Sequence, residues 1–173
     1  YSEVAPKCRE TQFEEFDSAL VKEIETRRQD IQGVFASGDV NTLYIGGGTP
    51  SVLPLTVFEK LLAALGRSKF DEFTVEVNPE DIVQKGEAYV EGLLSMGVNR
   101  ISMGVQSFDD GILKFMNRRH DADTARKAYE ILEASGVENI SIDLIFGLPQ
   151  LSDGQWEETL KEALTISGSG RPP

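Results

Sequence analysis

The sequence predicts an α/β fold in which parallel strands alternate with helices and form part of a TIM-like barrel. Two of the strand and helix units share a short repeat, because residues 97–102 and 136–141 are identical at their Gly, Val, Ile and Ser positions. The chain of 173 residues is shorter than the ~250 residues of a closed eight-stranded barrel, so we expect one incomplete barrel over residues 1–173. Strands are predicted at residues 42–45, 73–77, 100–105 and 139–145.

Helices are predicted between these strands from their end signals. Thr11 with Glu14, and Thr56 with Glu59, have the spacing of capping boxes at helix starts. Residues 29–40 show no periodic pattern, and we expect a surface loop there. Glycines stand where helices should end, at Gly66, Gly97 and Gly136.

Apolar and polar side chains alternate along the predicted strands. Ile101, Met103 and Val105 point to one side of their strand, and their neighbours point to the other. A parallel sheet normally buries both faces, and burying an unpaired polar group costs about 1–3 kcal/mol. We therefore expect one polar, concave face that holds a polar ligand, the alternative being a water-filled or internally hydrogen-bonded core. The residues predicted on this face are Tyr44, Thr74, Glu76, Ser102, Gln106, Ser141 and Asp143.

The carboxyl ends of the predicted strands carry groups that suit a charged ligand. Glycines at 46–48 let the backbone N–H groups approach a ligand, and Glu76, Gln106 and Asp143 stand late in their own strands. Carboxylates accept hydrogen bonds from ammonium and ribose groups, and Arg118 could bind a carboxylate of the same ligand. The alternatives are a tight turn without a ligand at the glycines and a solvated helix position for Arg118.

Five short motifs occur in order between residues 43 and 150. They are YIGGGTPS at 44–51, EVNP at 76–79, RISMGVQSF at 100–108, NRRH at 117–120 and IDLIFGLPQ at 142–150. As a set, these motifs resemble the radical S-adenosylmethionine (SAM) proteins related to oxygen-independent coproporphyrinogen III oxidase. This resemblance implies a barrel of the radical SAM type, in which the cofactor S-adenosylmethionine is bound by Gly47, Gly48, Thr49, Glu76, Gln106, Arg118 and Asp143.

The resemblance also suggests a role for each group. Arg118 would bind the carboxylate of S-adenosylmethionine, and Glu76 with the backbone of residues 47–49 would bind its ammonium group or ribose. Gln106 and Asp143 would bind the ribose or the adenine. In this family the radical is formed when a reduced cluster donates an electron to the sulfonium of S-adenosylmethionine.

Two residues favour the haem-chaperone branch of the family over the oxidase. Ser107 follows Gln106, and His120 follows Arg118 by two positions, although a lone histidine is more often a surface residue. The chaperone branch carries haem to client proteins, whereas the oxidase oxidises a porphyrinogen. Haem or porphyrinogen and haem-accepting proteins are therefore the expected partners. A more distant alternative is an unrelated α/β enzyme whose glycine loop binds phosphate.

The family holds a four-iron, four-sulfur (4Fe-4S) cluster on three cysteines spaced C-x3-C-x2-C, whereas this chain has one cysteine, Cys8. One thiolate cannot hold such a cluster. Cys8 stands in a segment without a strand or helix pattern. We expect the first strand and its cluster loop to precede Tyr1 and further strands to follow residue 173, so that the chain by itself binds no cluster.

Charge and composition narrow the classes of partner. The formal net charge is −12, which disfavours nucleic acids and anionic membranes. No spanning or signal segment is evident within these residues. A single cysteine forms no disulfide framework, and we expect a reducing, cytoplasmic compartment.

Overall fold

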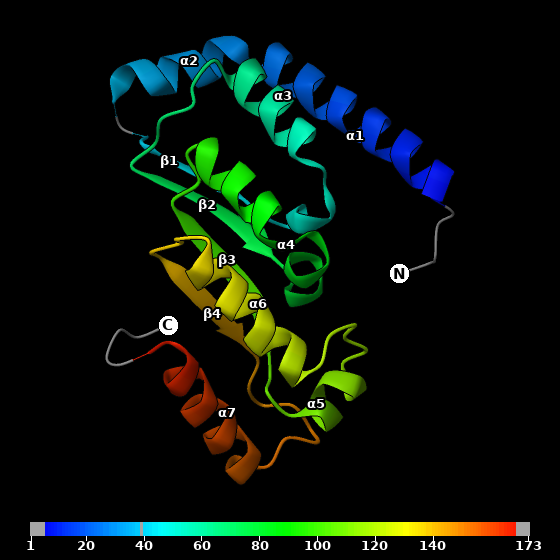
Figure 1. Ribbon diagram of the computed structural model, residues 1–173. Helices are drawn as coiled ribbons and strands as arrows, with labels where there is room; N and C mark the ends of the chain where they lie inside the picture. The colour runs from blue at the N-terminus through cyan, green and yellow to red at the C-terminus, as the bar shows by residue number, and fades with distance from the viewer. Residues whose placement is uncertain (1–5, 39, 169–173) are drawn as a thin grey trace. The chain divides into compact units, whose positions relative to one another are not determined.

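The computed structural model describes residues 6–38 and 40–168, and the chain divides into two compact units (Figure 1). The first unit is formed by the described parts of Tyr1–Leu43 and Leu53–Asp71, and the second by those of Tyr44–Val52 and Glu72–Pro173. The elements are α1 (Pro6–Thr26), α2 (Arg28–Ser37), β1 (Thr42–Ile45), η1 (Pro50–Val52), α3 (Leu55–Leu65), β2 (Glu72–Val77), α4 (Pro79–Ser95), β3 (Arg100–Gln106), α5 (Asp110–Phe115), α6 (Ala122–Ala134), β4 (Ile140–Leu144) and α7 (Asp153–Ile166).

The first unit contains helices α1, α2 and α3. The loop predicted at residues 29–40 is wrong, because α2 occupies most of it. This helix has no buried residue. Its contacts come from elsewhere in the unit: the Arg67 guanidinium lies 5.0 Å from the ring centres of both Phe35 and Phe70, and Gln32 donates to the Leu65 carbonyl at 3.2 Å.

Helix starts were predicted less well than helix ends. Helix α1 begins at Pro6, which suits a first helical position, so Cys8 and Thr11 lie inside a helix. Helix α3 begins at Leu55 after Pro54, and Thr56 is therefore not its cap. Both capping boxes were wrong, because α1 begins with an earlier proline and α3 directly follows one. The predicted ends are confirmed: Gly66 caps α3 at φ 68°, and Gly97 and Gly136 follow the last residues of α4 and α6 with positive φ.

The sheet has the strand order β1-β2-β3-β4, which is the order along the chain. Strands β2 and β3 are parallel, as are β3 and β4, and the register places Glu76 beside Ser102 and Ser102 beside Ser141. The four predicted strands are confirmed to within about one residue at each end. The α/β fold with a parallel sheet is thus confirmed.

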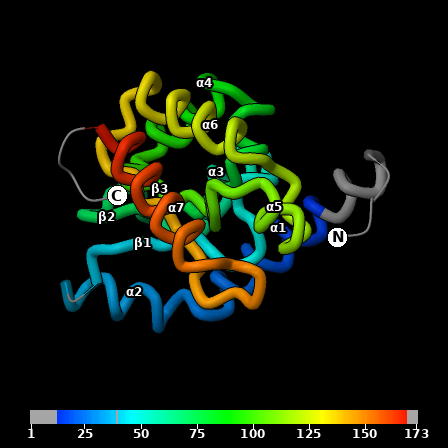
Figure 2. The backbone as a smooth tube through the Cα atoms, turned by 90° about the horizontal axis from the view of Figure 1, so that it is seen from below, coloured from blue at the N-terminus to red at the C-terminus, as the bar shows by residue number. Residues whose placement is uncertain are grey.

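One face of this sheet is covered by α4 and α6, which lie side by side (Figure 1 and Figure 2). Ile101, Met103 and Val105 are fully buried, in agreement with the predicted alternation. The opposite face carries hydrogen-bonded polar side chains. The parallel register brings those of successive strands to the same end of the sheet, where the candidate site lies.

Candidate functional site

Glu76, on β2, contacts β1 and the loop of residues 46–49, called the glycine loop, through its two carboxylate oxygens. The Tyr44 hydroxyl donates to Glu76 Oε1 at 2.6 Å, and the backbone N–H of Gly47 donates to Glu76 Oε2 at 3.0 Å. The hydrogen bond to the Glu76 carboxylate raises the pKa of the Tyr44 hydroxyl. Tyr44 is exposed and Glu76 half-buried, so a ligand can reach this carboxylate from solvent.

The glycine loop is shaped by close contact and by backbone conformation. A Cβ atom on Gly46 would lie 2.4 Å from Tyr44 Cε1 and 2.7 Å from Glu76 Oε1, so no side chain fits there unless both residues move. Gly47 and Gly48 adopt φ of 81° and 51°, which most other residues avoid. The loop thus keeps its backbone exposed beside Glu76.

Asn78 joins the glycine loop to Arg118. Its Nδ2 donates to Thr49 Oγ1 at 3.4 Å, and its Oδ1 accepts from Arg118 Nη2 at 3.1 Å. Arg118 Nη2 also donates to the Gly104 carbonyl at 3.1 Å. Arg118 therefore lies half-buried in the loop between α5 and α6, directed toward the strand ends, and it is not a solvated helix residue.

Gln106 ends β3 in an unusual conformation, with φ of 72° next to a register irregularity between Met103 and Gln106. A left-handed glutamine is uncommon, and such strain is found most often at functional sites. Its amide reaches back over Gly104, where a Cβ atom would lie 2.8 Å from Gln106 Nε2 and 3.6 Å from Arg118 Nη2. Gly104 therefore gives the space in which Gln106, Arg118 and Asn78 converge.

Asp143 lies on β4, next to the other side chains of the polar face. It is exposed, and its Oδ2 accepts a hydrogen bond of 2.9 Å from the Ser102 hydroxyl on β3. The negative charges of Glu76 and Asp143 both help to raise the pKa of the Tyr44 hydroxyl, so both carboxylates act on this residue. The structure thus brings Gly47, Glu76 and Asp143 into one group, and Thr49, Gln106 and Arg118 into a second group at the same strand ends.

Two residues of this network were absent from the predicted ligand-binding set. Tyr44 was placed on the correct face, but its bond to Glu76 depends on the spacing between two strands. Asn78 was seen only as part of a motif. Its position two residues after Glu76, at a strand end, was the signal that could have identified it.

The two residues that favoured the chaperone branch are both buried. His120 is 5% exposed, and its Nε2 lies 3.0 Å from the Val105 carbonyl, which accepts the hydrogen bond. The reading of a lone surface histidine is therefore wrong. Burial lowers the pKa of His120 and keeps the imidazole neutral. Ser107 accepts from the Asp109 N–H at 3.1 Å and lies 3.4 Å from the Thr159 hydroxyl, so it connects its loop to α7.

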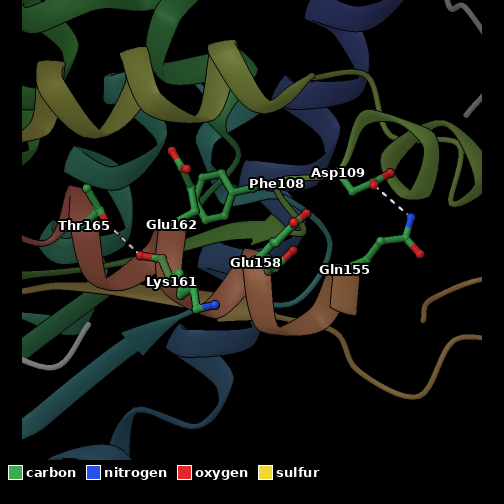
Figure 3. Close-up of a pocket in the computed structure, with 8 residues that line it drawn as sticks. Phe108, Asp109, Gln155, Glu158, Lys161, Glu162 and Thr165 are labelled. Carbon is green, nitrogen blue, oxygen red and sulfur yellow. Dashed lines mark hydrogen bonds between the residues drawn. The ribbon is translucent and has the colours of Figure 1, made fainter. Parts of the chain in front are cut away.

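A cavity of about 370 Å³ lies between the loop after β3 and α7 (Figure 3). Two of its carboxylates are engaged: Asp109 accepts from Gln155 Nε2 at 2.9 Å, and Glu162 accepts from Arg126 Nε at 2.7 Å. None of the predicted ligand-binding residues lines it. Its lining residues are Phe108, Asp109, Gln155, Glu158, Thr159, Lys161, Glu162 and Thr165.

The donor set on the polar face fits S-adenosylmethionine better than a metal. Two carboxylates, one guanidinium, one amide and exposed backbone N–H groups match a ligand that carries ammonium, carboxylate and ribose groups. Among the described residues, no group of three or more His, Cys, Asp or Glu side chains could hold a metal ion. Within the same residues, no helix has the length and apolar character needed to cross a membrane.

The known proteins that are similar to this chain belong to one family. A model of the radical SAM superfamily matches residues 10–163. The heme chaperone HemW of Lactococcus lactis is 40% identical over 142 residues, which cover 80% of this chain and 35% of that protein. The oxygen-independent coproporphyrinogen III oxidase of Paracoccus denitrificans is 28% identical over 162 residues, covering 91% of this chain and 35% of that protein.

A solved structure agrees with the sequence relatives. Coproporphyrinogen III oxidase (HemN) from Escherichia coli, described as a radical SAM enzyme, matches with a TM-score of 0.71 and 28% identity over 90% of this chain and 35% of that one. The chain thus spans about a third of the length of these relatives. Because the family model covers the glycine loop and all four strands, this chain belongs to the radical SAM superfamily.

Proposed function

We propose that the polar face at the ends of β1 to β4 binds S-adenosylmethionine, and that the chain is the cofactor-binding core of a haem-chaperone-like protein. The observation that carries the proposal is the convergence of Gln106, Asn78 and Arg118 over Gly104, at the same end of the sheet as the Glu76 carboxylate. These groups come from separate elements, and such convergent polar groups at strand ends are typical of ligand sites in parallel α/β folds.

Each group has a role that its charge supports. Arg118 binds the ligand's carboxylate, because guanidinium and carboxylate form strong charge-assisted bonds. Glu76 and the backbone of residues 47–49 bind the ammonium group or the ribose. Gln106 and Asp143 bind the ribose or the adenine, and together these contacts fix the orientation of the sulfonium. Bound beside a reduced iron–sulfur cluster, S-adenosylmethionine supplies radical chemistry in proteins of this family.

The cluster itself does not fit the residues of this chain. Its one cysteine, Cys8, cannot supply three thiolate ligands. We therefore expect iron and sulfide assays after anaerobic reconstitution of the 173-residue chain to find no stoichiometric cluster. Incorporation of four irons per chain would contradict this expectation.

The haem-chaperone proposal is supported by the relatives named HemW, which reach 40% identity, and by the resemblance at Ser107 and His120 described above. An oxygen-independent coproporphyrinogen III oxidase is the second candidate, supported by the relative from Paracoccus denitrificans and by the HemN structure. In a protein that contains this chain, haem binding without turnover of coproporphyrinogen would favour the chaperone. Turnover would favour the oxidase and make the protein an enzyme.

The cofactor proposal is tested by titrating S-adenosylmethionine into the ¹⁵N-labelled chain and recording amide shifts. We expect weak binding, with shifts concentrated at residues 46–49, 76–78, 104–106 and 117–119. Inorganic phosphate, added separately, tests the alternative of a phosphate loop. Shifts at 46–49 with phosphate and none with S-adenosylmethionine would overturn the proposal.

A further inference from the structure

A second layer of polar contacts lies beneath the candidate site and is centred on Asp81, near the start of α4. Asp81 is 4% exposed. Its Oδ2 accepts a hydrogen bond of 2.6 Å from the Ser51 hydroxyl, and its Oδ1 accepts from Arg119 Nη2 at 3.4 Å. A buried carboxylate is costly unless it is paired, and both oxygens of Asp81 have partners.

The partners of Asp81 stand next to the residues that line the site. Ser51 lies in η1, two positions after Thr49 and directly beyond the glycine loop. Its Oγ accepts a hydrogen bond of 3.0 Å from the Asn78 N–H. Arg119 follows Arg118 directly, and its Nε also pairs with Glu80 Oε2 at 3.1 Å. One carboxylate thus fixes the glycine loop, the end of β2 and the loop between α5 and α6.

The glycine loop is held from the same direction by Lys85, one turn further along α4. Its Nζ donates to the Ser51 carbonyl and lies 4.1 Å from the centre of the Tyr89 ring. Ser51 is therefore fixed through both its hydroxyl and its carbonyl. Within the segment from Gly47 to Thr49, the Gly47 N–H donates to Glu76 and the Thr49 hydroxyl accepts from Asn78, so the anchored Ser51 adds a third fixed point just after it.

We propose that Asp81 is a positioning residue for the ligand site, which holds Thr49, Asn78 and Arg118 in register by binding Ser51 and Arg119. The proposal rests on the proposed binding of S-adenosylmethionine to the polar face. It predicts that the two loops lose their alignment together when Asp81 is changed, although Asp81 touches no ligand. It also predicts that Ser51 and Asp81 act as one unit.

The experiment compares Asp81→Asn, Ser51→Ala and the double variant with the unchanged chain. Asp81→Asn keeps the shape and one acceptor oxygen but cannot accept from both Ser51 and Arg119. Asp123→Asn is the matched control, because Asp123 is an exposed carboxylate that pairs only locally, with Arg126 three residues on. Melting temperature and affinity for S-adenosylmethionine are measured for each chain.

We expect each single change to weaken S-adenosylmethionine binding by about 10-fold, the scale of a hydrogen bond to a charged group. The double variant should be little weaker than either single variant, because both break the same connection. The control should bind as the unchanged chain does. A lower melting temperature with unchanged affinity in the folded protein would overturn the proposal and leave Asp81 a structural residue.

A second readout separates this proposal from the cofactor assignment. In the ligand-free chain, Asp81→Asn should shift the amide signals of both the 46–49 and 117–119 segments and increase their hydrogen exchange. If these changes occur but no chain binds S-adenosylmethionine, the positioning role stands and the cofactor assignment fails. If only signals next to Asp81 change, the positioning role is wrong.

Discussion

The two faces of the sheet differ in what their side chains do. On the face under α4 and α6, Ile101 and Met103 have no exposed surface and no polar partner. On the opposite face, Glu76 and Asp143 stay accessible and have hydrogen-bond partners on neighbouring strands or loops. The covered face stabilises the fold, and in our proposal the open face arranges polar groups for a ligand. The same strands serve both purposes because side chains alternate along them.

The largest expected effect comes from breaking the covered face. Ile101→Ala removes three buried carbons beneath the helices, which should lower the free energy of unfolding by about 2–5 kcal/mol. Urea denaturation of the chain measures this loss. Ser141→Ala, on the open face, is the control and should change stability by no more than about 0.5 kcal/mol. Equal losses for the two variants would contradict the division between the faces.

On the open face, Arg118→Ala should affect binding and not folding. Removal of the guanidinium should weaken S-adenosylmethionine binding by about 1.5–3 kcal/mol, the worth of a hydrogen bond to a charged group. The melting temperature should remain nearly unchanged, because Arg118 is only half-buried. Calorimetric titration measures the affinity, with Lys114→Ala as an exposed cationic control. A large fall in stability with unaltered affinity would make Arg118 structural.

A smaller effect is expected from Gly46→Ala, which tests the contact between the glycine loop and Glu76. The new methyl group would displace the Tyr44 ring and the Glu76 carboxylate, so the affinity should fall by about 1 kcal/mol, the worth of one hydrogen bond. Gly33→Ala is the control, because no atom lies within 4 Å of its Cβ position and alanine favours a helix. Unchanged affinity in Gly46→Ala would show that Glu76 need not hold this position.

The smallest effect concerns pH and His120, whose pKa burial lowers below the ordinary value of about 6.5. Above that pH the histidine is neutral in both folded and unfolded chains and adds no pH dependence. As the pH falls below the ordinary pKa of histidine, His120 takes up a proton in the unfolded chain before it does so in the folded chain. The free energy of unfolding therefore decreases until the pH has passed the lower pKa of the folded state.

His120→Gln removes this titration and keeps an amide that can donate to the Val105 carbonyl. The decline in stability between pH 7.5 and 5.5 should therefore be shallower in the variant. Urea denaturation at several pH values measures both slopes. Identical slopes would show that other groups cause the decline.

The sequence predicted regular features well, since they repeat along the chain. The strands were predicted from the alternation of apolar and polar side chains, and the same alternation predicted which side chains share the polar face. Residues 29–40 were not identified as a helix, because α2 buries none of its residues and its contacts join it to Leu65 and Arg67, about 30 positions further along the chain.

Details of the site depend on contacts between elements, which a sequence does not show. The left-handed backbone of Gln106 could not be foreseen, because glutamine rarely adopts it. The bond from Asn78 to Arg118 joins residues 40 positions apart. The predicted ligand set therefore named residues that the structure brings to the same strand ends, whereas the residues that contact or support them, Tyr44, Asn78 and Asp81, required the structure.

The strand order has a consequence for how the chain folds. Strands β3 and β4 each pair with the strand that precedes them in the sequence. Each pairing therefore closes a single loop, which consists of the helical segment between the two strands. Paired residues are 26 apart between Thr74 and Arg100 and 39 apart between Ser102 and Ser141. The entropic cost of closing a loop grows by only about 0.6 kcal/mol for each doubling of loop length. Pairing β3 with β2 and pairing β4 with β3 therefore cost nearly the same free energy. The sheet can therefore grow one strand at a time as the chain leaves the ribosome.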